Sequence, residues 1–232
     1  MLVTHRNALL LTFVSVVVGG VIFLLNPPWV ERENPLELYK QGVALNNEGD
    51  YDGAVRAYRK ALELAPDVPR IHYSLGIALY NKDDLDGAVG AYRDARELDP
   101  EDPTVHTNLG IALAEKGDLD GALASLREAI RLDPDDAENH YNLGVALCMK
   151  GAPDEAIAAL EESLRLDPED SETLYNLGRA HALKKDATRA AEYLARAIAL
   201  DADSCELARE EKDFGAVRSD PLFVKLLGPP EE

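Results

Sequence analysis

Three asparagines recur at an interval of thirty-four residues, and their side chains suit the recognition of another polypeptide. They are Asn108, Asn142 and Asn176, and Lys40 and Ser74 stand at the same place in the two preceding intervals. A carboxamide both donates and accepts hydrogen bonds, so it can pair with a peptide group whatever side chain that peptide carries. This column therefore predicts hydrogen bonding to an extended peptide.

A tyrosine directly precedes this column in four of the five intervals. These residues are Tyr39, Tyr73, Tyr141 and Tyr175, and Thr107 takes the place in the third interval. Tyrosine adds rigid apolar area with a polar tip, which suits a binding surface. A second interpretation stays open, in which Tyr-Asn-Leu-Gly is only part of the repeating pattern and the asparagines bond within their own fold.

The elements that must position these residues repeat with the same interval. Each interval has a glycine two residues after the column: Gly42, Gly76, Gly110, Gly144 and Gly178. Alanines follow twelve residues later, at Ala54, Ala88, Ala122, Ala156 and Ala190. A fixed period of this length marks a stack of identical supersecondary units. Apolar residues recur at helical spacing on both sides of a short break, so each unit is predicted to be two helices.

The repeat also contains residues that mark where its helices begin and end. The predicted N-caps of the second helices are Asp50, Asp84, Asp118 and Asp186. Units close on Leu-Asp-Pro, for example at residues 98–100, where the proline stops the helix. Small residues at fixed points let the two helices approach closely, and a larger side chain there would force them apart.

These positions resemble the tetratricopeptide repeat (TPR), over residues 35–204. The five units are residues 35–68, 69–102, 103–136, 137–170 and 171–204. The resemblance implies an all-α solenoid whose first helices line a concave, partner-binding groove. The implied groove residues are Tyr39, Tyr73, Ser74, Asn108, Tyr141, Asn142, Tyr175, Asn176 and Arg179. The implied partner is a protein or peptide. Lys40 and Arg179 lie too far apart in the stack to clamp one terminal carboxylate.

A column of histidines departs from the family pattern. The family's aromatic near the start of the unit is replaced by Leu38, His72, His106, His140 and Leu174. Three histidines in a column suggest a metal site, but zinc needs nitrogens that converge within about 2.1 Å of one ion. One histidine per helix pair makes this difficult, so packing is the favoured interpretation and no metal or cofactor is predicted.

Residues 205–232 are predicted to cap the stack. Residues 205–212 can form a short helix over the last unit. The apolar residues that follow can pack back onto it: Phe214, Val217, Leu222, Phe223, Leu226 and Leu227. The two cysteines, Cys148 and Cys205, do not make a disulfide framework.

The first thirty-four residues differ from the rest. Residues 8–25 carry no charge, and as a helix they would span roughly 27 Å, close to the thickness of a bilayer core. An uncleaved single-pass anchor is favoured over a cleaved signal peptide and over a buried soluble helix, since the apolar run exceeds the usual 7–15 residues of a signal core. The linker, residues 26–34, keeps the first unit near the membrane. Arg6 ahead of the anchor predicts a cytoplasmic N-terminus and an extracytoplasmic TPR domain, periplasmic in a bacterium.

The net charge and the lack of catalytic motifs exclude several classes of function. The net charge of −19 belongs entirely to residues 35–232, because Arg6 and Arg32 balance Glu31 and Glu33. Such a body is repelled by nucleic acid. No phosphate-binding loop or catalytic constellation occurs, so the chain is predicted not to be an enzyme. The predicted function is a membrane-anchored scaffold, an assembly or maturation adaptor for a membrane or secreted complex, with a membrane-proximal partner. The alternative is a permanent subunit of a membrane complex.

Overall fold

The computed structural model describes residues 15–18, 21–24 and 33–228, and the last of these ranges consists of helices joined by short turns and loops. Ten helices of thirteen or fourteen residues form five helix-turn-helix pairs. The pairs are α1 (Pro35–Asn47) with α2 (Tyr51–Leu64), α3 (Pro69–Asn81) with α4 (Leu85–Leu98), α5 (Pro103–Glu115) with α6 (Leu119–Leu132), α7 (Ala137–Lys150) with α8 (Pro153–Leu166), and α9 (Ser171–Leu183) with α10 (Ala187–Leu200). The predicted all-α stack is confirmed.

Capping and helix ends follow the sequence signals. Asp118 accepts a hydrogen bond from the backbone of Gly121 at 3.0 Å, and Asp50, Asp84 and Asp186 cap their helices in the same way. The aspartate oxygen satisfies a backbone N–H that has no partner inside the helix. The three Leu-Asp-Pro sequences fall at the ends of α4, α6 and α8, as predicted.

The periodic glycines allow the two helices of a pair to approach closely. A Cβ placed on Gly110 would lie 2.6 Å from Cγ of Leu126 in the facing helix, and one on Gly42 would lie 2.5 Å from the ring of Tyr58. Both distances are shorter than van der Waals contact, so any larger residue would push the pair apart. The steric role predicted for these glycines is confirmed.

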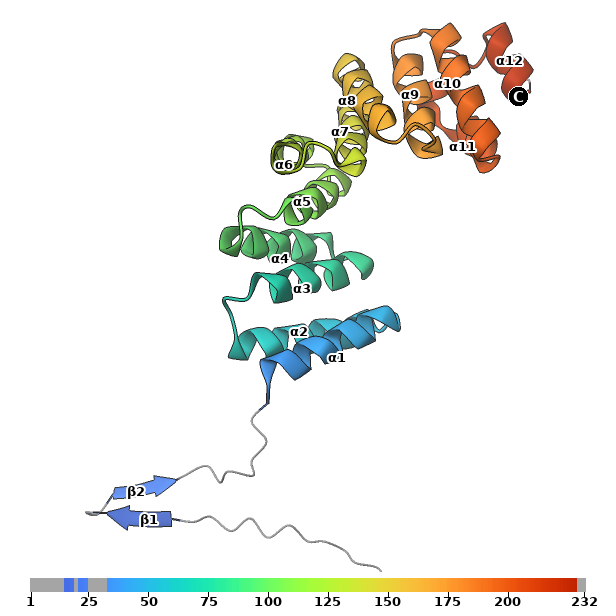
Figure 1. Ribbon diagram of the computed structural model, residues 1–232. Helices are drawn as coiled ribbons and strands as arrows, with labels where there is room; N and C mark the ends of the chain where they lie inside the picture. Colours follow the sequence, from blue (N-terminus) through green and yellow to red (C-terminus); the bar gives the residue numbers. More distant parts are fainter. Residues whose placement is uncertain (1–14, 19–20, 25–32, 229–232) are drawn as a thin grey trace, which may run out of the picture.

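The pairs stack in chain order along a curved path (Figure 1). Helix α1 contacts α3, α5 contacts α7 and α7 contacts α9, and hydrogen bonds join α3 to α5. The second helices of the pairs, α2, α4, α6, α8 and α10, make no comparably extensive contacts with one another in the described part of the chain. We call the side on which successive odd-numbered helices meet the inner face.

The C-terminal segment caps the stack, as predicted. It consists of α11 (Asp203–Glu210), the 3₁₀-helix η1 (Lys212–Phe214) and α12 (Pro221–Leu227), which pack on α9 and α10. Phe214 and Phe223 are fully buried there. The prediction for Leu222 is wrong, since its side chain stays 44% exposed at the start of α12 beside a shallow apolar hollow.

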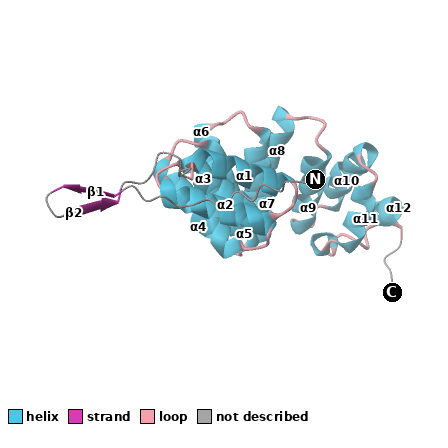
Figure 2. Ribbon diagram, turned by 90° about the horizontal axis from the view of Figure 1, so that it is seen from below, coloured by secondary structure: helices cyan, strands magenta, loops and turns pink. Residues whose placement is uncertain are grey.

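The described residues of the predicted anchor form strands. β1 (Ser15–Val18) and β2 (Val21–Leu24) pair antiparallel, with Ser15 opposite Leu24 (Figure 2). The expectation of a helix at these residues is wrong in this structure. The physical reason is their content of valine and isoleucine, whose β-branched side chains favour strands. The other residues of the 8–25 segment lie outside the described ranges, as do residues 26–32 of the linker.

Among the residues that the structure describes, no helix is both long enough and apolar enough to cross a bilayer.

Candidate partner-binding face

Asn108 is held by the fold on the inner face. Its Nδ2 donates to the hydroxyl of Tyr73 on α3 at 3.3 Å and to the carbonyl of Thr104, one turn earlier in α5, at 2.9 Å. Both amide hydrogens are therefore committed, and only the carbonyl oxygen remains for a ligand.

Asn176 repeats this arrangement two units later. Its Nδ2 donates to the Tyr141 hydroxyl at 3.5 Å and to the Glu172 carbonyl at 3.0 Å. Its oxygen accepts a hydrogen bond from Arg179 at 2.8 Å. Each of these two asparagines thus links one unit to the tyrosine of the unit before it, which supports the interpretation that part of the column is structural.

Asn142 differs from both neighbours. The preceding unit has Thr107 where a tyrosine would provide the hydroxyl partner, and the Thr107 hydroxyl instead lies within hydrogen-bond distance of the Pro103 carbonyl and of the Asn139 side chain. Among the described residues, Nδ2 of Asn142 has no hydrogen-bond partner, although that atom is buried. A buried donor without a partner costs about 1–3 kcal/mol, so this carboxamide is the one in the column that gains from an added acceptor.

The tyrosines pack against the second helices and keep their protons. The rings of Tyr39 and Tyr58 lie 5.9 Å apart, as do those of Tyr73 and Tyr92. Burial raises the pKa of Tyr58 to about 12, and burial also raises the pKa of Tyr73, with Asp102 adding to the effect. At neutral pH these hydroxyls are therefore neutral groups that can donate or accept.

The C-terminal segment covers the end of the inner face. Nε of Arg179 lies 2.8 Å from a carboxylate oxygen of Asp213, and the ring of Phe214 meets Tyr175 edge-on with centroids 5.7 Å apart. Two predicted groove residues, Tyr175 and Arg179, are thus occupied by the protein's own tail. The part of the face left open runs from α1 to α7.

An aliphatic row on this face was missed by the sequence analysis. One residue after each of the first four glycines stands a half-buried aliphatic residue: Val43, Ile77, Ile111 and Val145. Each lies three residues after the asparagine column, so both are on one helix face. Arg179 takes this place in α9, where its bond to Asn176 shows the shared face directly. The interval of thirty-four residues could have revealed the row.

A second periodic feature holds the units together away from the asparagine column. Lys82, Lys116 and Lys150 each pair with an aspartate of the preceding unit: Asp52 at 2.6 Å, Asp86 at 2.5 Å and Asp120 at 2.6 Å. Lys184 and Asp154 form the fourth pair. The hydrogen bond from its lysine lowers the pKa of Asp52 and of Asp120. Solvent screens exposed pairs of this kind, so each contributes little to stability.

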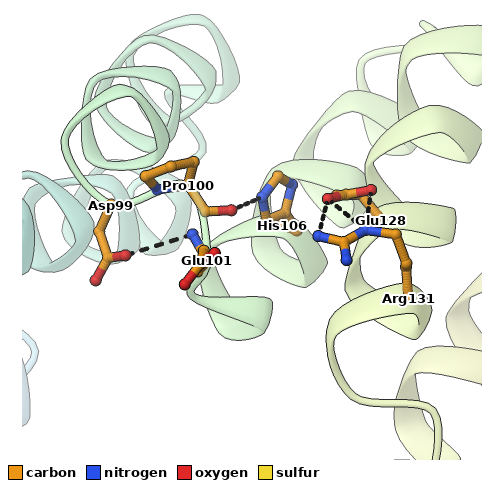
Figure 3. Close-up of polar contacts among 6 residues, drawn as sticks. All are labelled: Asp99, Pro100, Glu101, His106, Glu128 and Arg131. Atoms are coloured by element: carbon orange, nitrogen blue, oxygen red, sulfur yellow. Dashed lines mark hydrogen bonds and ion pairs between the residues drawn. The ribbon is translucent and has the colours of Figure 1, made fainter.

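The histidine column closes the ends of the units. Nε2 of His106 lies 2.9 Å from the carbonyl oxygen of Pro100, the proline that ends the preceding unit (Figure 3). His72 and His140 make the same contact with Pro66 and Pro134. The packing interpretation accounts for all three rings, and no cluster of three metal-ligating side chains occurs among the described residues.

The cysteines do not pair with each other. Cys148 is buried in α7 and Cys205 is partly buried in α11, and both are free thiols. Burial raises the pKa of Cys148 to about 11, so its thiol stays protonated and unreactive at neutral pH.

Comparison with protein families identifies the repeat. A TPR model described as the cilia and flagella-associated protein 70 C-terminal domain matches residues 38–210. The chain belongs to this TPR family. The match runs from α1 through the last residue of α11, so it includes the whole inner face. TPR domains bind proteins or peptides and are typically non-enzymatic. No curated protein matches the sequence.

Solved TPR structures share the fold. MamA (residues 41 to the end) from Desulfovibrio magneticus RS-1 is 25% identical, with a TM-score of 0.69, covering 73% of this chain and 97% of that chain. YrrB, described as a TPR protein with an unusual peptide-binding site, is 25% identical with a TM-score of 0.65, covering 75% of this chain and 89% of that chain. PilF of Pseudomonas aeruginosa is 24% identical with a TM-score of 0.64, covering 85% and 93%, and shows the fold alone.

Proposed function

We propose that the chain is a TPR scaffold that binds an extended segment of a partner protein on the open part of its inner face. The observation that carries this proposal is the row formed by Val43, Ile77, Ile111 and Val145 beside the tyrosine and asparagine columns. A half-buried aliphatic row gives a partner apolar area to cover, and the neighbouring carboxamides and hydroxyls fix its position. The peptide-binding site named for YrrB, a similar structure, supports the same use of the fold.

The proposal includes a place at the membrane. Its support is the sequence of residues 8–25, which carries no charged side chain. A two-stranded sheet has open edges, which lipid cannot satisfy. The anchor proposal therefore requires this segment to become helical in a bilayer, with the TPR domain on the extracytoplasmic side. Sodium carbonate extraction of membranes should leave the full chain in the pellet and release a variant lacking residues 8–25. Equal release of the two contradicts the anchor.

The function is tested by purification of the intact protein in a mild detergent, with quantitative identification of the proteins that accompany it. The double variant Ile77→Glu and Ile111→Glu places charges on the inner face, and it should lose the partner. The matched control is Leu98→Glu, at an exposed leucine at the end of α4, and it should keep the partner. Retention of the same partners by all three proteins contradicts inner-face binding.

The same purification separates two kinds of scaffold. We propose an assembly or maturation adaptor, which should accompany its partner in less than equal amounts and dissociate in high salt. A partner recovered one-for-one in high salt would instead identify a permanent subunit of a complex.

A further inference from the structure

The part of the open inner face formed by α5 and α7 has side chains that indicate the chemical class of the partner. Ile111 and Val145 are its half-buried aliphatic residues, and Met149, one turn after Val145, is 48% exposed. Met149 is a flexible and polarizable side chain that adapts to different apolar groups. An aliphatic side chain of a ligand would find contact area here.

Carboxylates surround this apolar strip. Glu138 lies one turn before Asn142, and Glu115 lies one turn after Ile111. Glu172, at the start of α9, lies beside Tyr141. Burial raises the pKa of that tyrosine, and Glu172 raises it further. All three glutamates are exposed.

The positive charges on and beside α5 and α7 are few, and they are paired with carboxylates. Helix α5 contains no lysine or arginine, and the lysine that ends α7, Lys150, is paired with Asp120. The guanidinium of Arg179, whose charge acts on Tyr141, is bound to Asp213. The field over this strip is therefore negative, and it attracts cationic ligands and repels acidic ones.

The tail provides an internal comparison for this region. Where α9 has Arg179 in the aliphatic row, the segment seated on it brings an aspartate and a phenylalanine. By the same complementarity, a segment that matched Ile111 and Val145 among glutamates would carry aliphatic and basic side chains. Nδ2 of Asn142 has no hydrogen-bond partner among the described residues, so an acceptor on a peptide group of that segment would satisfy it.

We propose that the α5–α7 part of the inner face binds an extended, positively charged peptide segment. An aliphatic side chain of the segment lies on Ile111 and Val145, its lysine or arginine side chains face Glu115 and Glu138, and its backbone bonds to Asn142. This assignment rests on the proposed function and specifies the class of partner.

The test uses three fluorescein-labelled nine-residue peptides and the full chain in detergent. Their common pattern is Gly-Xaa-Val-Xaa-Gly-Xaa-Val-Xaa-Gly, with Xaa as lysine, glutamine or glutamate. Fluorescence anisotropy should show that the lysine peptide binds at least about tenfold more tightly than the glutamine peptide, and that the glutamate peptide does not bind. Equal affinity for the three peptides, preference for glutamate, or no binding of the lysine peptide up to about 1 mM overturns the proposal.

Two variants separate a defined site from general attraction to an acidic protein. Val145→Glu adds a negative charge and removes the aliphatic contact, so affinity for the lysine peptide should fall at least about tenfold, whereas general attraction would leave it unchanged or raise it. Leu64→Glu adds the same charge at an exposed site on α2 and should change affinity less than about twofold. Unchanged affinity in Val145→Glu overturns the proposal.

Asn142→Ala provides a second variant that keeps the fold if Val145→Glu does not. It should weaken binding of the lysine peptide by about tenfold, because a single hydrogen bond to the peptide backbone is lost. Unchanged affinity in this variant removes Asn142 from the site and contradicts the proposed contact. A glutamine peptide that binds as well as the lysine peptide, and is lost with Val145→Glu, would contradict the charge preference alone and leave the proposed function standing.

Discussion

Nδ2 of Asn108 lies 3.3 Å from the hydroxyl of Tyr73, a residue of the preceding helix pair. Asn176 makes the equivalent contact with Tyr141 at 3.5 Å. Between them, Asn142 follows a unit that has Thr107 in place of the tyrosine, and its Nδ2 has no hydrogen-bond partner among the described residues. Three asparagines that look equivalent in the sequence therefore differ in the fold, where two of them join consecutive units and one is left unbonded.

Replacement of each asparagine by alanine should separate these roles. Asn108→Ala loses two hydrogen bonds and should lower the free energy of unfolding by about 1–3 kcal/mol. Asn142→Ala loses none within the described structure and removes a buried donor that has no partner, so it should leave the free energy of unfolding unchanged or raise it. Urea denaturation of the two variants measures the difference, and equal losses would contradict the assigned roles.

The two helices of a pair approach closely at the periodic glycines, and this gives a second prediction. Gly110→Ala places a Cβ 2.6 Å from Leu126 and should cost about 1–3 kcal/mol of stability. Gly90, an exposed glycine in α4, has no atom within 4 Å of a Cβ position. Because alanine restricts the unfolded chain, Gly90→Ala should stabilise the fold by about 0.4–1 kcal/mol. Thermal unfolding of both variants checks the opposite signs.

A buried histidine predicts how stability depends on pH. His181 is 2% exposed and stacks on Tyr193, and burial lowers its pKa below the ordinary value of 6.5. The unfolded chain therefore takes up this proton at a higher pH than the folded one. His181 therefore makes its full contribution to the free energy of unfolding above about pH 6.5. This contribution is lost as the pH falls through the pKa of His181 in the folded protein.

The variant His181→Phe keeps the stacked ring and removes the titration. Between pH 7 and pH 5 the free energy of unfolding should fall less in this variant than in the wild type. The difference between the two slopes should be at most about 1.4 kcal/mol per pH unit, the limit for one titrating group. Urea unfolding across this range, compared between the two proteins, isolates the one group. Identical slopes would contradict a titrating His181.

The bond between a histidine and the end of the preceding unit gives another prediction. His106→Phe restores the family's aromatic residue but removes the bond to Pro100, and should cost about 0.5–1.5 kcal/mol. If the histidine column bound zinc, added zinc would raise the melting temperature of the wild type but not of the variant. We expect the same response from both, measured by thermal unfolding in zinc chloride and in a chelator.

Much of the helical stack could be predicted because its signals are local and repeated. An aspartate such as Asp118 marks a helix start through its own hydrogen bond, and a proline such as Pro100 ends a unit through its own backbone. The strand pair at β1 and β2 could not be predicted from hydropathy, since the same valines favour strands and also suit a membrane helix.

The site was harder to predict than the fold, because its state depends on residues far apart in the chain. The sequence predicts that Arg179 lines the groove. The structure is needed to show that Asp213 pairs with its guanidinium. The repeat period makes Asn142 equivalent to Asn108. The two differ in their hydrogen bonds, because the unit before Asn142 has Thr107 in place of a tyrosine. The period of thirty-four residues predicts which residues occupy equivalent positions in successive units. The hydrogen bonds and ion pairs that these residues form can be read only from the structure.

The central claim is that a partner protein lies on the inner face. Its most direct test is photo-crosslinking in cells, with p-benzoylphenylalanine placed at Ile111 on the inner face or at Glu97, an exposed residue of α4. The account predicts one discrete cross-linked partner from position 111 and none from position 97. A partner captured equally from both positions, or only from position 97, would contradict it.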